Sequence, residues 1–344
     1  MVRRALAITL LGLVLAGPRI PGAAAEPKAT WAWAAIAPDQ SVFADLGNAL
    51  IDRAEKNLRG ELRIKRRFGG VLGDELSTLR MCQEGHLEAW GGSLGALISV
   101  VPELRSLELP FQFRDLATLR ATLRKLRRGR IPKIMAAFER RGLVLVTMGV
   151  IGWRDLASTD RPIRTTADLK GLRARSQDSE IHLAMWRALG TVPKATSLNE
   201  LPAVFDAERF QVLDIPASFL YATSVDSKIR YYTLTHHMPQ LAAVVVNKAA
   251  WDRLSKEARA HFTDGMEDVD SKGERAAEAF DAELHAMLAK KGVTIIQPTR
   301  EELQQLAAAT RSIAATVEQS SSKVEREIMG EIARALQASQ APGR

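Results

Sequence analysis

The 344-residue sequence contains a single cysteine, Cys82. One cysteine excludes an internal disulfide, and the length is sufficient for two domains with hydrophobic cores of their own. We expect Cys82 to be a buried, small apolar residue on a helix over residues 74–84. If it were exposed, its free thiol could link two copies of an exported chain.

After its first residues the chain also lacks any apolar run long enough to cross a bilayer. Residues 1–25 carry Arg3 and Arg4, then a short apolar stretch, then Ala23-Ala24-Ala25. This order is typical of a signal peptide, and general secretion is favoured over the twin-arginine route because the residues around the arginine pair match that motif poorly. Pro18 stands where a lipoprotein signal needs cysteine. We therefore expect an exported protein without a lipid anchor.

The formal net charge is +8, and loss of Arg3, Arg4 and Arg19 with the predicted signal peptide would leave about +5, which is mild for this length. The densest basic run, residues 124–130, contains no aromatic side chain, which indicates a solvated face and no nucleic-acid partner. The glycine turn of residues 69–73 lacks the Lys-Ser/Thr ending of a phosphate loop and the spacing of a dinucleotide loop, so no nucleotide cofactor is expected. His236 and His237 are adjacent on a predicted strand and point to opposite faces, so we expect no metal site.

Strands alternate with helices at the start of the chain, which predicts an α/β fold with a parallel sheet. The predicted strands cover residues 30–36, 61–67, 87–90, 143–147, 153–156, 172–175, 210–214, 241–246 and 293–296. The predicted helices cover residues 39–57, 74–84, 116–127, 132–140, 179–189 and 197–207, one long helix over residues 255–291, and one C-terminal helix from Thr299.

Residues 91–95 read Gly-Gly-Ser-Leu-Gly, which fits the G-x-S-x-G turn of a hydrolase nucleophile between a strand and a helix. A serine hydrolase using Ser93 is therefore an alternative. Its acid and base would come from the following residues: Asp214 or Asp226, and His236 or His237. No glycine run suited to an oxyanion hole precedes the motif, so we favour a reading in which no residue is catalytic.

The segment from Pro162 to Arg175 combines a stiff loop, a helical turn capped by Thr165 and Asp168, and a short strand that ends at Arg175. Open α/β sheets bind ligands at strand ends. An arginine there offers a planar fork of donors suited to a carboxylate.

Three segments together resemble the solute-binding proteins of TRAP (tripartite ATP-independent periplasmic) transporters, of the dicarboxylate-receptor type: residues 162–190, the turn Gly69 to Asp74, and the run Leu109 to Asp115. The resemblance covers nearly the whole mature chain. It implies a two-lobed periplasmic-binding-protein-like fold, each lobe a mixed sheet flanked by helices, with a long helix bracing both lobes. It also implies a periplasmic protein that is not an enzyme, and that captures a small molecule between the lobes for a membrane permease.

On this resemblance we divide the chain into a signal peptide (1–25), lobe I (26–151 plus 240–278), lobe II (152–239 plus 279–340) and a disordered tail (341–344). Gly149, Gly152 and the region near Pro239 are the expected hinge points, because glycines loosen the backbone where the chain crosses between the lobes.

The resemblance also implies the ligand site. Arg175 matches the family arginine that grips the ligand's carboxylate, Arg154 matches a second arginine that faces it, and Ser93 lies on a glycine loop that approaches it. Leu198 and Ile215 replace an aromatic residue and an asparagine. The remaining apolar wall is expected from Trp153 and Phe219.

We therefore expect a carboxylate with an apolar body. The alternative is an uncharged hydrophobic or lipid-like ligand, delivered together with a helical-repeat periplasmic lipoprotein. A receptor that presents its ligand to a sensor fits the same pattern.

Overall fold

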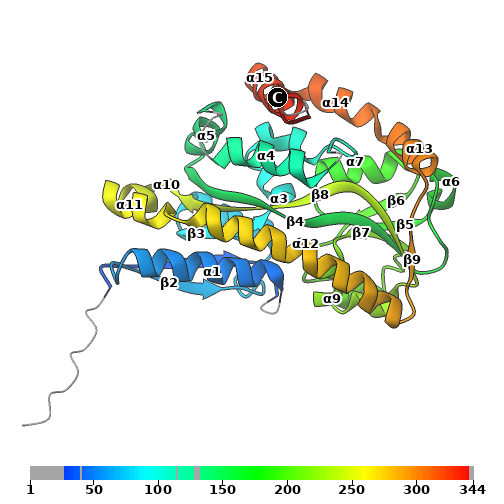
Figure 1. The fold of residues 1–344 in the computed structure, drawn as a ribbon, viewed down its shortest axis with the longest axis horizontal. Coiled ribbons are helices and arrows are strands. Elements are labelled where there is room, and N and C mark those ends of the chain that lie inside the picture. Colours follow the sequence, from blue (N-terminus) through cyan, green and yellow to red (C-terminus); the bar gives the residue numbers. More distant parts are fainter. Residues whose placement is uncertain (1–26, 39–40, 114, 128–131, 341–344) are drawn as a thin grey trace, which may run out of the picture.

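The computed structural model of the chain describes residues 27–38, 41–113, 115–127 and 132–340. The predicted signal peptide, residues 1–25, and the predicted tail, residues 341–344, lie outside these ranges. In the described part a mixed β-sheet runs through the molecule with helices on both faces (Figure 1). The predicted α/β architecture is confirmed.

The sheet has the strand order β2-β1-β3-β8-β4-β7-β5-β6, with β9 paired to β8. The bounds are β1 (Ala29–Ala35), β2 (Leu62–Arg67), β3 (Ala89–Ser93), β4 (Leu143–Ser158), β5 (Arg173–Ser176), β6 (Val192–Ala195), β7 (Val212–Ile215), β8 (Tyr231–Asn247) and β9 (Thr294–Ile296). β1 pairs in parallel with β2 and β3, and β5 pairs in parallel with β6 and β7. Each end of the sheet is thus a parallel unit, and the antiparallel strands β4 and β8 join the two.

Helices cover the two faces of the sheet (Figure 1). One face carries α1 (Val42–Asn57), α8 (Leu201–Val204), α9 (Ala217–Ala222), the 3₁₀ turn η2 (Val225–Lys228), α10 (Lys248–Asp252), α11 (Lys256–Thr263) and α12 (Met266–Lys290). The other carries α2 (Glu75–Glu84), α3 (Leu94–Ile98), the 3₁₀ turn η1 (Pro102–Glu108), α4 (Leu116–Arg127), α5 (Pro132–Glu139), α6 (Thr166–Leu169), α7 (Glu180–Ala188), α13 (Arg300–Thr310), α14 (Ser312–Ser320) and α15 (Lys323–Gln340).

β4 and β8 are much longer than the sequence predicted. We expected strands over residues 143–147, 153–156 and 241–246, separated by glycines and by Pro239. In the structure, β4 and β8 pair from Leu143 and Asn247 to Ser158 and Tyr231, with three register shifts along the way. Gly149 and Pro239 are paired within this ladder, with Ala242 and Trp153 respectively. One shift lies at Gly152, which takes a φ of +146° that only glycine adopts readily. The expected lobe boundaries at 151/152 and 239/240 fall inside these continuous strands.

The hydrophobic core is divided on one face of the sheet and continuous on the other. Beneath α1 and α11 one cluster contains Trp33 and Phe262, and beneath α9 and α12 a separate cluster contains Leu220 and Leu284. On the opposite face a single cluster extends from Trp90 in β3 to the residues of α7. The two ends of the sheet therefore have separate cores on one face and share a single core on the other.

The predicted long helix is two helices. α11 ends at Thr263, and Gly265 adopts a left-handed φ of +70° before α12 begins. A side chain at Gly265 would overlap the guanidinium of Arg53, and the Nδ2 of Asn57 donates to the carbonyl of Asp264 at 3.0 Å. At 1.5 Å per residue, the 25 residues of α12 span about 37 Å, and they contact α1 as well as α9 and β9. α12 thus braces both ends of the sheet, as expected of the long helix.

Two further helix predictions were wrong. The helix predicted over residues 197–207 is only α8, because Pro202 cannot occupy a helix interior and lies in its first turn. The single C-terminal helix predicted from Thr299 is three helices. Thr299 caps the first of them as predicted, and forms a capping box with Glu302. α15 packs against α4 and η1, whereas α13 packs against α6 and α7, so this segment contacts elements at both ends of the sheet.

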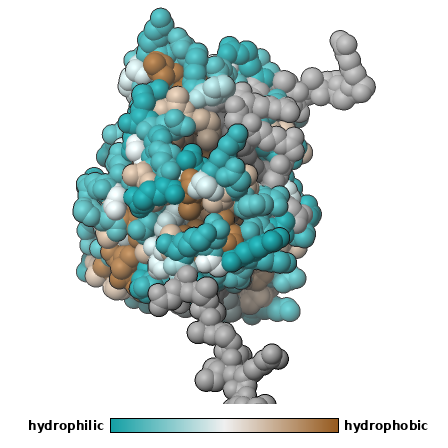
Figure 2. Space-filling view, turned by 90° about the vertical axis from the view of Figure 1, so that its left-hand side faces the viewer, coloured by the Kyte–Doolittle hydropathy of each residue, from teal (hydrophilic) through white to brown (hydrophobic). Residues whose placement is uncertain are grey.

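The face shown in Figure 2 is mostly hydrophilic, with apolar side chains confined to small patches. Among the described helices, none has both the length and the apolar composition that a bilayer span requires.

Cys82 lies on α2 as predicted and is fully buried. Burial raises the pKa of its thiol to about 12. Because the thiolate is the reactive form, we expect a chromogenic disulfide reagent at pH 8 to leave the native protein unlabelled. In denaturant the same reagent should label one thiol per chain. Rapid labelling of the native protein would show that α2 opens readily.

Candidate functional site

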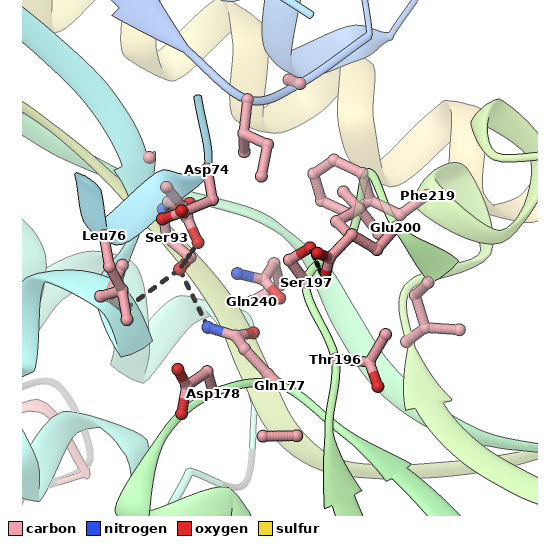
Figure 3. A pocket seen from close by; sticks show the side chains of 18 of the residues that line it. Asp74, Leu76, Ser93, Gln177, Asp178, Thr196, Ser197, Glu200, Phe219 and Gln240 are labelled. Atoms are coloured by element: carbon pink, nitrogen blue, oxygen red, sulfur yellow. Dashed lines mark hydrogen bonds between the residues drawn. The ribbon is translucent and has the colours of Figure 1, made fainter. Parts of the chain in front are cut away.

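A cavity of about 410 Å³ lies at the carboxyl ends of β1 and β3 on one side and of β5, β6 and β7 on the other. This is where open α/β sheets bind ligands. Figure 3 shows Asp74, Leu76 and Ser93 facing Thr196, Ser197, Glu200 and Phe219 across it. The long strands β4 and β8, which join the two ends of the sheet, contribute Ile151, Arg154 and Gln240 to its lining.

The cavity brings together six of the seven ligand-binding residues predicted from the sequence: Ser93, Arg154, Arg175, Leu198, Ile215 and Phe219. Trp153, the seventh, is absent from its lining. The side chain of Trp153 is buried and stacks on His236, with 5.6 Å between the ring centroids. Neighbouring residues of a strand point to opposite faces, so Trp153 and Arg154 could not both enter the cavity.

Arg175 is held with one side of its guanidinium turned to the protein. It lies at the end of β5, and only 3% of the residue is exposed. Its Nε and Nη2 both donate to the carbonyl oxygen of Thr196, at 3.0 and 2.7 Å. The Nη1 group has no hydrogen bond to the described protein. Burial, and then the charge of Arg154, lower the pKa of Arg175 to about 10, so it stays protonated at neutral pH.

Arg154, in contrast, makes four hydrogen bonds to the protein through all three of its nitrogens. Its Nε donates to the Oδ2 of Asp214 at 2.5 Å and its Nη2 to the carbonyl of the same residue at 2.6 Å. Its Nη1 donates to Gln240 and, at 3.2 Å, to the Oε1 of Gln177. Both members of the Arg154–Asp214 pair are buried, and the positive charge of Arg154 is compensated where it lies.

Asp214 also approaches two buried histidines. Its Oδ2 lies 3.5 Å from the Nδ1 of His182 and 3.6 Å from the Nε2 of His237. Burial alone would raise the pKa of Asp214, but Arg154 and these histidines hold it well below its usual range. Burial would likewise lower the pKa of His182. Its contacts with Asp214 and with Glu108, whose Oε2 is 3.4 Å away, raise that pKa instead.

Ser93, the last residue of β3, belongs to a polar hydrogen-bond network. Its hydroxyl donates to the Oε2 of Glu75 at 2.8 Å and accepts from the Nε2 of Gln177 at 2.9 Å (Figure 3). Its backbone N–H donates to the Oε1 of Glu75. Burial raises the pKa of Glu75, while these Ser93 contacts and the charge of Arg175 oppose the rise.

The arrangement does not form the hydrolase triad that the sequence allowed. In the described residues no histidine is a hydrogen-bond partner of Ser93. His236 is bound to Asp155 through its Nδ1 at 2.9 Å, and Asp226 pairs with Lys291. In the same part of the chain no group of three or more histidine, cysteine, aspartate or glutamate side chains could hold a metal ion.

Sequence reasoning missed the residues that surround the two arginines. Gln177 follows β5 directly, and Glu75 starts the helix after the glycine turn, so the rule of polar residues at strand and helix ends could have found both. Gln240 and the partnership of Asp214 with Arg154 had no such signal. The lining is also more polar than the largely apolar wall we expected, although its apolar side includes Ile36, Phe43, Ile151, Ile215 and Phe219.

Removing Asp214 should expose the dependence of the fold on the buried ion pair. We expect Asp214→Asn to lower the free energy of unfolding by about 3–5 kcal/mol, because Arg154 would keep a buried charge without its counter-ion. Asp206→Asn, which removes only the exposed pair with Lys228, should change it by less than about 1 kcal/mol. Urea unfolding of both variants makes the comparison. Similar small losses would mean that another group compensates Arg154.

Comparison with known proteins gives the family. A sequence model of the family described as "Bacterial extracellular solute-binding protein, family 7" matches residues 34–320. The 2,3-diketo-L-gulonate-binding periplasmic protein YiaO of Escherichia coli is 27% identical over 207 residues, which span 60% of this chain and 62% of that protein.

Two solved structures have the same fold. The sugar acid binding protein DctPAm of Advenella mimigardefordensis, in complex with galactonate, has a TM-score of 0.83 at 17% identity and covers 92% of this chain and 99% of that one. A TRAP periplasmic solute binding protein of Roseobacter denitrificans with bound β-D-glucuronate has a TM-score of 0.81 at 19% identity, with coverages of 91% and 100%. At these identities the likeness establishes the two-lobed fold.

The match of the family model over most of the length settles the assignment. The chain belongs to the bacterial extracellular solute-binding proteins of family 7, the family of the TRAP solute-binding proteins, and is a binding protein rather than an enzyme.

Proposed function

We propose that this protein is exported to the periplasm, captures an organic monocarboxylate with an apolar body between its lobes, and delivers it to the membrane permease subunits of a TRAP transporter. The signal peptide of residues 1–25, cleaved after Ala25, is part of this proposal. So is the division into lobe I (26–151 plus 240–278) and lobe II (152–239 plus 279–340), which close on the ligand.

Arg175 is the observation that carries the proposal. Arg175 lines the cavity and its Nη1 has no protein partner, so a ligand that displaces water from the cleft has to satisfy this donor, and a carboxylate suits its planar geometry. The Roseobacter protein holds glucuronate, the Advenella protein galactonate, and YiaO is named for 2,3-diketo-L-gulonate; each of these ligands carries a carboxylate.

The charge of the lining favours a ligand with one carboxylate. Arg154 is neutralised by Asp214, which leaves Arg175 and the exposed Arg80 as the cations of the cavity. Against them the lining presents the acidic residues Asp74, Glu75, Asp178 and Glu200. A second carboxylate on the ligand would meet these acids, and like charges at a binding surface cost several kcal/mol.

The alternative ligand is an uncharged hydrophobic molecule that is shared with a helical-repeat periplasmic lipoprotein. Such a ligand would leave Arg175 without an anion in the closed cleft. The apolar side of the cavity accommodates the body of a monocarboxylate equally well. The geometry therefore favours an acid, and the lipoprotein partner belongs only to the alternative.

Replacing Arg175 tests the anchor. We expect Arg175→Ala to weaken binding of a monocarboxylate by about two to three and a half powers of ten, the range for breaking a desolvated charge pair. Arg175→Lys should recover part of the loss, because an ammonium lacks the bidentate fork. Titration calorimetry measures both, with Arg173→Ala as the matched control, since Arg173 is an exposed arginine of the same strand. Unchanged affinity in Arg175→Ala would favour the uncharged ligand.

The charge of the lining makes a second prediction. Pentanoate and glutarate have the same number of carbon atoms and differ in one terminal carboxylate. We expect glutarate to bind at least about ten-fold more weakly than pentanoate at neutral pH, because its second carboxylate faces the acidic residues. Competition titrations of both acids give the ratio. Tighter binding of glutarate would show that Arg80 or Arg154 receives a second carboxylate.

A further inference from the structure

A second, small cavity of about 20 Å³ lies beneath α1, next to the cavity that contains Arg175. Phe43, in the first turn of α1, and Ile151, on β4, line both cavities and form the boundary between them. The Cζ of Phe43 lies 3.7 Å from the point where a Cβ on Gly91 would be, so its ring reaches across to β3. The apolar side of the larger cavity thus continues into the space beneath α1.

The chemistry of the small cavity suits an alkyl group. Its lining is apolar except for the hydroxyl of Thr147 and the indole N–H of Trp33, and includes Leu46, Leu50, Phe68 and Val244. A buried water needs two to four polar partners, so this lining suits an apolar group better than a water. The volume is just above that of one water-sized sphere, which is about the size of a methyl group.

Gly149 forms part of the wall of this cavity. Gly149 on β4 pairs with Ala242 on β8, and both line the cavity. A Cβ at Gly149 would meet its first neighbour, the Oε1 of Glu274, at 3.7 Å, an ordinary contact distance. In comparison, a Cβ at Gly47 would come within 3.1 Å of the ring of Phe68. Packing therefore requires a small residue at 47, but leaves room for a methyl group at 149.

We propose that the cavity beneath α1 is a subsite for the alkyl end of the bound acid, which enters it between Phe43 and Ile151. This inference rests on the proposed function, since it assumes an acid whose carboxylate is held at Arg175. The ligand class is then an aliphatic monocarboxylate long enough to reach from β5 to α1. Phe43 and Gly149 set the length and the branching that the site accepts.

A series of straight-chain acids from acetate to octanoate, titrated by calorimetry, tests the subsite. In the wild-type protein affinity should rise about four-fold per methylene until the subsite is filled. Gly149→Ala occupies the space with a methyl group, so it should weaken the longest tight-binding acids about four-fold and leave acetate and propanoate unchanged. Phe43→Leu enlarges the entrance and should shift the optimum to a longer acid.

Gly330→Ala is the matched control, because Gly330 lies on α15 and the added Cβ has an ordinary contact of 3.6 Å there. It should leave the whole series unchanged. Equal effects of Gly149→Ala on short and long acids, or no effect on either, would overturn the subsite while Arg175→Ala still abolishes binding. If no acid binds the wild-type protein, or if Arg175→Ala changes nothing, the proposed function fails and the subsite falls with it.

Discussion

The buried ion pair between Arg154 and Asp214 is the contact on which the arrangement of the cleft depends. It joins crossing strand β4 to β7, and Gln240 adds the other crossing strand, β8, to the same guanidinium. His182 and His237 approach the carboxylate from α7 and from β8. Two charges so deeply buried are stable only together, so these four elements have to meet in one geometry for the fold to be favourable.

This pair also affects which donors the cleft offers to a ligand. Arg154 makes four hydrogen bonds within the protein and is paired with Asp214, so it positions its neighbours and offers few donors to a ligand. Arg175 is different, because the carbonyl of Thr196 orients its guanidinium while its Nη1 remains available. The site thus has one arginine paired within the protein and one with a free Nη1, surrounded by acidic side chains. In the proposed function, selectivity would follow from this division of roles rather than from the number of arginines.

The sequence predicted those parts of the site that local rules control. The capped turn of Thr165 and Asp168, the strand that follows it and the position of Arg175 at its end were all predictable, because the capping box and the strand pattern involve near neighbours. The partner of Arg154 was not predictable, since Asp214 is 60 residues away and only the register of β4 with β7 brings them together. Glycine and proline were misread as strand ends. In the structure a register shift of β4 accommodates Gly152, and Pro239 of β8 stays paired with Trp153 of β4. The break at Gly265 was not predicted, because the contacts made there by Arg53 and Asn57 come from α1, more than two hundred residues earlier in the chain.

The late position of β8 in the chain has a consequence for the order in which the molecule can assemble. β3 pairs with residues 242–246 of β8, so the sheet built from β1, β2 and β3 is completed by a strand that follows more than a hundred residues later. A polypeptide that stops before residue 231 presents β3 as an open edge, with unpaired N–H and C=O groups available to any other strand. A nascent or truncated chain is therefore prone to self-association until β8 arrives, and one strand closes both halves of the sheet at the same moment.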